Sequence, residues 1–237
     1  MIAKCLEDDA TPKMVSQYKE EKSSLGMRRL KMVELVVILI QTKQAAVDAE
    51  LISARVLPLC VGLFFQFEWS NMLHSLVEHI VINVVESGRA ELQSSLLTDS
   101  KLLERILLAY KQDEVRRTEP RSCRTGYVGH LNRICNLFVA TLDTIESEQG
   151  EEAAADNDEP SSRFARLLTE DAQFSEFQTF VLATLAEINV VETCPLGGQA
   201  PSNEQHLVRA RACFSVLQSG CNSSSHRFFS LPLGRSI

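Results

Sequence analysis

Two segments of this chain resemble each other at a spacing of 45 residues, and this internal repeat limits the possible folds more than any other feature. The first segment is ELISARVLPLCVGLFFQF (50–67), and the second is ELQSSLLTDSKLLERILLAYKQ (91–112). Apolar residues correspond along both segments, as Leu51 does with Leu96. Each segment therefore predicts the same unit, a short helix, a sharp break and a longer helix.

Three longer segments with apolar residues at helical spacing flank and separate these units. They lie at about 28–43, at NMLHSLVEHIVINVVES (71–87) and at GHLNRICNLFVATL (129–142), and each predicts an amphipathic helix. A third, weaker copy of the unit follows at 163–192. Helical units that recur near this period are typical of armadillo and HEAT proteins. We predict an all-α, armadillo/HEAT-like helical-repeat solenoid.

Helix starts are indicated at several places by residue type. Pro58 suits a first helical turn, where its missing N–H costs nothing. Thr98 or Asp99 is predicted to cap the second helix of the second unit, and Ser70 or Asn71 the long helix that follows the first unit.

Composition divides the chain into parts and excludes several classes of protein. We expect residues 1–24 to be a flexible lead-in or a frayed helix, residues 25–192 to form the repeat domain, and residues 193–237 to be a disordered tail. An acidic loop at about 143–160 interrupts the domain: eight Asp or Glu and no Lys or Arg lie between 143 and 159. It is either a docking segment for a basic partner or a solvated linker.

The 10 Gly and 7 Pro are too few for the frequent turns of a β-sandwich or barrel. The first 29 residues have no apolar core of a secretory signal, and the apolar runs at 35–40 and 56–65 are too short to span a membrane. We therefore expect no insertion into membranes, and expect the seven cysteines to be thiols in a reducing compartment. A net charge of −7 argues against nucleic-acid binding.

Motifs for catalysis or metal binding were sought, and the strongest is HSLVEH at 74–79. It resembles the H-x-x-E-H metal motif but is one residue too long, so its two histidines lie about 140° apart on a helix. His74 and Glu78 share a helix face and could form a hydrogen bond. We predict no catalytic residues, no metal and no cofactor.

Polar and aromatic residues gather where two of the long helices begin, in FEWSNMLH (67–74) and RTGYVGHLNR (124–133). They either pack between repeats or form a partner-binding surface, for which Trp, Tyr and Arg are typical residues. The partner-binding candidates are Trp69, Asn71, His74, Glu78, Tyr127, Gly129, His130 and Arg133.

These residues carry a resemblance to a known family. LGMRRLKMVELVVILIQT, ELISARVLPLCVGLFFQFEWSNMLHSLVEHIV, LLERILLAY and GYVGHLNRICNLFV, in this order, resemble the SAPS-domain proteins, from about Leu25 to Glu192. The resemblance implies a non-catalytic regulatory or scaffolding subunit of the type 6 (Sit-type) serine/threonine protein phosphatase. It implies the phosphatase catalytic subunit as partner, with further adaptor proteins, and a location in the cytoplasm, with the nucleus as a second location.

Two alternatives remain open. One is a helical-repeat adaptor for proteins unrelated to phosphatases. The other is a small all-α enzyme centred on His74, Glu78, His130 and Arg133, which would require these side chains to converge in a closed pocket.

Overall fold

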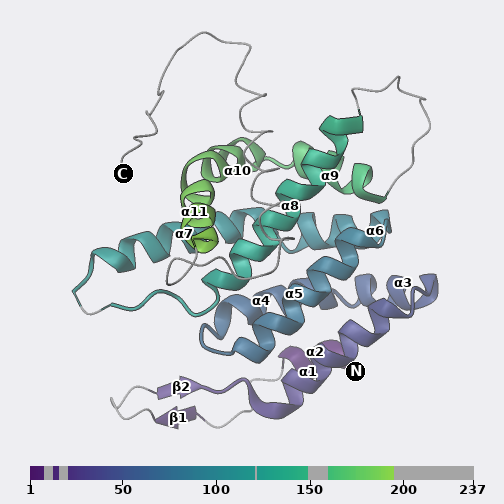
Figure 1. The fold of residues 1–237 in the computed structure, drawn as a ribbon. Helices are drawn as coiled ribbons and strands as arrows, with labels where there is room; N and C mark the ends of the chain where they lie inside the picture. Colours follow the sequence, from purple (N-terminus) through teal and green to yellow (C-terminus); the bar gives the residue numbers. More distant parts are fainter. Residues whose placement is uncertain (8–12, 16–20, 121, 149–159, 195–237) are drawn as a thin grey trace, which may run out of the picture. The chain divides into compact units, whose positions relative to one another are not determined.

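The computed structural model describes residues 1–7, 13–15, 21–120, 122–148 and 160–194 (Figure 1). These residues are predominantly helical, as predicted. One short antiparallel pair of strands, β1 (Lys13–Val15) and β2 (Glu21–Ser23), was not predicted; Lys13 lies opposite Ser23 in it. The chain forms two compact units, Met1–Leu185 and Ala186–Ile237, and the second contains the described helix α11 (Ala186–Thr193).

Three long helices form at the positions that the apolar spacing predicts. They are α2 (Gly26–Gln41), α5 (Asn71–Glu86) and α8 (Val128–Glu148). Helix α5 packs against α2 on one side and α8 on the other (Figure 1). Their i, i+3, i+4 apolar residues, such as Leu73, Val77, Ile80 and Val84 of α5, are almost fully buried. Burial of these faces against one another is the main source of helix stability here.

A further set of helices follows each of these three helices. The first set is α3 (Ala45–Ser53) and α4 (Val56–Gln66); the second is α6 (Ala90–Ser94), the π-helix η1 (Ser95–Asp99) and α7 (Leu102–Thr118); the third is α9 (Pro160–Glu170), α10 (Phe174–Phe180) and the π-helix η2 (Val181–Leu185). Helices of successive sets contact each other: α6 packs against both α3 and α9, α4 against η1, and α10 against α7. The chain from α2 to α10 is therefore built of three consecutive layers.

Equivalent residues of the first two layers are 45 positions apart at the start of each set of helices and 46 positions apart further along. Leu51 and Leu96, 45 residues apart, are both buried. The second helices, however, start 46 residues apart, after Arg55 and Lys101, which have positive φ values of 51° and 50°. Leu96 lies within the π-helix η1, which accommodates the extra residue before Lys101, as π-bulges do.

Two sequence predictions are wrong because of this shift. Leu108, which the 45-residue spacing pairs with Leu63, is 52% exposed, and Ala109 takes the equivalent buried position. Helix α7 starts at Leu102, so Thr98 and Asp99 lie within the π-helix and do not cap it. Pro58 does lie in the first turn of α4, as expected.

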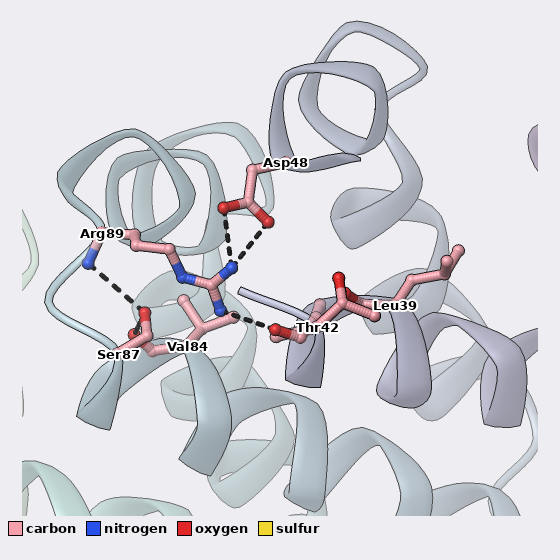
Figure 2. Close-up of polar contacts among 7 residues, drawn as sticks. Leu39, Thr42, Asp48, Val84, Ser87 and Arg89 are labelled. Atoms are coloured by element: carbon pink, nitrogen blue, oxygen red, sulfur yellow. Dashed lines mark hydrogen bonds and ion pairs between the residues drawn. The ribbon is translucent and has the colours of Figure 1, made fainter. Parts of the chain in front are cut away.

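A partly buried arginine joins the first layer to the second (Figure 2). Arg89, just before α6, donates from Nη1 to both carboxylate oxygens of Asp48 on α3, at 2.6 and 2.7 Å, and from Nη2 to the carbonyl of Ile40 at 3.0 Å. The Ile40 carbonyl lies at the end of α2, where it also accepts the backbone N–H of Lys43 at 3.2 Å. Gln93 acts similarly one layer on, donating to the carbonyl of Val85 near the end of α5 at 3.0 Å.

Residues 1–24, for which we expect a flexible lead-in or a frayed helix, contain helix α1 (Ile2–Glu7). This helix packs against α2 and α4, and its Cys5 and Leu6 are buried. These two apolar side chains hold α1 on the first layer. Within the described residues, no helix is both long and apolar enough to cross a membrane.

The acidic loop and the tail were predicted at 143–160 and 193–237. Helix α8 continues to Glu148, so the first acidic residues of the loop belong to a helix. Residues 149–159 and 195–237 lie outside the described residues, and the disordered tail stays a prediction.

Candidate functional site

The turn between α4 and α5 presents the single tryptophan of the chain to solvent. Phe67 ends α4 and is buried, whereas the next two residues turn outward and Trp69 is 62% exposed. Ser70 stands at the N-cap of α5, but its hydroxyl caps no backbone N–H of this described helix. The predicted cap is therefore wrong, and the turn is held by other contacts.

The loop between α7 and α8 packs directly on this turn. Gly126 lies so close that a Cβ there would be 2.5 Å from the carbonyl oxygen of Glu68 and 3.0 Å from the indole ring of Trp69. Arg116 on α7 donates two hydrogen bonds to the Glu68 carboxylate, at 2.8 and 3.0 Å. These bonds raise the pKa of Arg116. The turn and the loop are thus one connected surface.

Asp113 on α7 fixes the other end of the loop. Its buried carboxylate accepts hydrogen bonds from the backbone N–H and hydroxyl of Thr125, at 2.9 and 3.2 Å. The guanidinium groups of Arg117 and Arg124 lie 3.3 and 3.4 Å from the same carboxylate and are about half exposed. A buried carboxylate with such partners avoids the cost of an unpaired charge.

A polar network joins the first turns of α5 and α8. His130 on α8 contacts Glu78 through Nδ1 at 2.5 Å and the side-chain oxygen of Asn71 through Nε2 at 2.8 Å. Arg133 lies 3.4 Å from the Glu78 carboxylate and stays 69% exposed. The expected hydrogen bond between His74 and Glu78 is replaced by these contacts, because α8 brings its own partners to Glu78.

His74 lies beneath this network in an aromatic cluster. Its Nε2 donates to the Phe67 carbonyl at 2.9 Å, and its ring packs edge-on against Phe64 and Tyr127. Nδ1 has no hydrogen-bond partner among the described residues. Burial, with the nearby His130 as a smaller cause, lowers the pKa of His74. Burial has the opposite effect on Tyr127, whose pKa it raises, because the charged form of its hydroxyl is an anion.

The eight predicted site residues thus lie together, where the turn before α5 meets the start of α8. They divide by exposure: Trp69, Asn71, Gly129 and Arg133 are exposed, and His74, Glu78, Tyr127 and His130 are buried. The buried four join helices, and the exposed four are the ones that a partner could touch. Sequence reasoning missed Glu68, Asp113 and Arg116, which carried no periodic or motif signal.

The convergence that a small enzyme would require is present, since His74, Glu78, His130 and Arg133 are neighbours. However, His74 is fully buried, and Glu78 and His130 are at most 9% exposed. Their hydrogen bonds are directed to one another and to the backbone. Within the described residues, no group of three His, Cys, Asp or Glu side chains could hold a metal ion.

A separate groove of about 600 Å³ lies between the first short helices of the three layers. Ile52 and Leu167 provide apolar lining, and Arg166 and Asp99 bring charges of both signs. None of the predicted site residues lines this groove.

The fold and this cluster define a predominantly helical protein with a rigid, solvent-facing aromatic and cationic edge. The chain belongs to the SAPS family, whose model, described as SIT4 phosphatase-associated protein, matches residues 1–193. The match includes the N-terminal segment, which the sequence analysis had placed outside the domain.

Curated relatives agree with this membership. Serine/threonine-protein phosphatase 6 regulatory subunit 3 of Gallus gallus is 27% identical over 188 residues, which cover 73% of this chain and 20% of that protein. Regulatory subunit 1 of Mus musculus is 31% identical over 183 residues, again 73% of this chain and 20% of the relative. Extragenic suppressor of kinetochore protein 1 of Schizosaccharomyces pombe is 27% identical over 163 residues, 67% of this chain and 18% of that protein.

The chain thus spans about a fifth of the length of these relatives. No solved structure matches the chain.

Proposed function

We propose that this chain is a non-catalytic regulatory or scaffolding subunit that binds the catalytic subunit of a type 6-like serine/threonine protein phosphatase and influences its activity, targeting or substrate choice. Its family membership supports this role, as do relatives named as regulatory subunits of phosphatase 6. In this role the phosphatase supplies the chemistry, and the chain acts by binding, in the cytoplasm and the nucleus.

The proposed scaffold is an armadillo-like solenoid. The three consecutive layers, each beginning with α2, α5 or α8 and continuing with a further set of helices, support this interpretation. Contacts between successive layers create long continuous faces, and repeat proteins bind partners along such faces. The groove between α3, α6 and α9 offers a second surface, where the proposed role would place substrates or further adaptors.

The exposed tryptophan is the observation that carries the proposed binding surface. Trp69 is 62% exposed although it is held against Gly126, and the exposed Arg133 and Asn71 lie on the helices that meet beside it. A large aromatic residue whose position is already fixed loses little conformational entropy on binding, and Trp and Arg are the usual hot-spot residues of interfaces.

A pull-down with purified catalytic subunits of the type 2A, 4 and 6 phosphatases tests the proposal. We expect the whole chain to retain the type 6 subunit and Trp69→Ala to retain markedly less at an unchanged melting temperature. Ile38→Ala is the matched control, since Ile38 is an exposed apolar residue on α2 and is none of the predicted site residues. Binding to none of the three would contradict the proposal and favour an adaptor for unrelated proteins.

A phosphatase assay separates regulation from catalysis. The chain alone should release no phosphate from a phosphopeptide, and adding it to the catalytic subunit should change the rate or the substrate preference. Phosphate release by the isolated chain that is lost in Glu78→Gln would instead support the enzyme centred on His74, Glu78, His130 and Arg133.

A further inference from the structure

The surface around Trp69 is rich in guanidinium groups, although the chain as a whole is acidic. Residues 111–133 contain six Lys or Arg and three Asp or Glu, in a chain with a net charge of −7. Three of these arginines are Arg117, Arg124 and Arg133, whose side chains are 49%, 47% and 69% exposed. With Trp69 they form what we call the arginine edge.

The carboxylates that accompany these arginines lie beneath them. Arg117 and Arg124 share Asp113, and Arg133 contacts Glu78; the side chains of these two acids are 3% and 9% exposed. In each of these three ion pairs the arginine is therefore the member that solvent and a partner can reach. Two guanidinium groups on one carboxylate also leave hydrogen-bond donors for another acceptor, because each guanidinium has five.

The positions of these groups are fixed by contacts within the protein. Thr125 and Gly126, the residues that follow Arg124, are held by Asp113 and by the turn at Glu68. Arg133 lies one helical turn after His130, which is itself bonded to Glu78 and Asn71. Preorganised guanidinium groups bind carboxylates bidentately, and such charge complementarity determines orientation and partner choice.

We propose that the arginine edge binds an acidic segment of a protein, with Asp or Glu side chains on Arg117, Arg124 and Arg133 and an apolar side chain on Trp69. This inference rests on the proposed function, in that the acidic segment belongs to the phosphatase or to a protein bound with it. A nucleic acid fits the surface less well, because the remainder of the acidic chain would repel a long polyanion.

The test uses the full chain and a short fluorescein-labelled peptide of Glu, Asp and Leu, with a peptide that has Lys in place of the acids as control. Fluorescence anisotropy should show binding of the acidic peptide that weakens as NaCl is raised, and no binding of the Lys peptide. In the double variant Arg124→Gln/Arg133→Gln we expect the Kd to rise about tenfold and its salt dependence to become shallower.

Arg55→Gln is the matched control, because Arg55 is an exposed arginine between α3 and α4, outside both the edge and the groove. It should bind the acidic peptide as the unaltered chain does. Equal Kd values for the double variant and for Arg55→Gln, at melting temperatures like that of the unaltered chain, would overturn the inference. Tighter binding of a single-stranded DNA of similar length than of the acidic peptide would also overturn it.

The same variants separate this inference from the proposed function. In one outcome the acidic peptide does not bind, and the phosphatase is retained by the double variant, and at high salt, as well as by the unaltered chain. The inference then fails and the proposed function stands. If the acidic peptide binds in an Arg-dependent way and none of the phosphatases does, the surface chemistry stands and the proposed function fails.

Discussion

Gly126 lies against Trp69 so closely that no side chain fits between them. A Cβ on Gly126 would be 3.0 Å from the indole ring and 2.5 Å from the Glu68 carbonyl oxygen, so an added methyl group must displace the loop or the turn. The same glycine therefore positions the exposed tryptophan and joins the α7–α8 loop to the start of α5.

Replacing Gly126 by Ala tests this contact. We expect Gly126→Ala to lower the free energy of unfolding by about 1–3 kcal/mol, as overpacking does in closely packed sites. The fluorescence of the single tryptophan should change as well. Gly129→Ala, three residues on in the open first turn of α8, should be neutral or stabilising by up to about 1 kcal/mol. Identical melting and emission spectra for the two variants would contradict the close approach.

The ion pair between Arg89 and Asp48 should stabilise the protein more than an exposed ion pair of the same length does. It is 2.6 Å long, like the pair Lys31–Glu34, but its side chains are 20% and 10% exposed against 63% and 44%. We expect Arg89→Ala or Asp48→Ala to cost about 2–4 kcal/mol, because each leaves a poorly solvated charge without its partner.

Double-mutant cycles, measured by urea unfolding, compare the coupling energies of the two ion pairs. The coupling energy for Arg89 and Asp48 should exceed about 1.5 kcal/mol, whereas that for Lys31 and Glu34 should stay below about 1 kcal/mol. Equal coupling in the two cycles would mean that Arg89 does not join the layers.

Periodicity was enough to predict the long helices, because a buried face fixes which residues must be apolar. Helix α5 shows this: Leu73, Val77, Ile80 and Val84 are spaced by three and four residues and are all buried. The one-residue shift between the layers could not be predicted, because a π-helix such as η1 leaves the hydrophobic pattern nearly unchanged. Arg55 and Lys101, at positive φ, are not the residue types that indicate such a turn.

The candidate site was predictable as a set of residues but not as a network. Trp69 and Arg133 stand out by residue type, at the starts of helices. The pairing of His130 with Glu78 joins residues 52 positions apart and depends on how α8 packs on α5. Arg89 follows Gly88 in a loop with no periodic signal, so its role between layers appears only in three dimensions.

His74 should make stability depend on pH. Burial lowers its pKa in the folded state from the ordinary value of 6.5, so the unfolded chain binds the proton more readily. The contribution of neutral His74 is complete above pH 6.5 and is lost as the pH falls below that value. We expect the unaltered chain to lose more stability than His74→Gln on acidification from pH 7.5 to about pH 5.

Urea unfolding of both proteins across this range provides the measurement, and the difference between the two curves isolates His74 from the carboxylates. Gln keeps a donor for the Phe67 carbonyl but does not titrate. Parallel curves for the two proteins would show that His74 does not couple folding to pH.

Cysteine reactivity should report directly on burial in the layers. Cys60 and Cys135 are fully buried, and burial raises the pKa of both thiols, that of Cys60 to about 12. Cys123, in the α7–α8 loop, is exposed. Since the thiolate is the reacting form, we expect iodoacetamide at neutral pH to alkylate Cys123 at least about 100-fold faster than Cys60 or Cys135. Peptide mass spectrometry of a time course gives the three rates, and in urea they should converge. Equal rates for Cys60 and Cys123 in the folded protein would mean that α4 does not pack into the core as described.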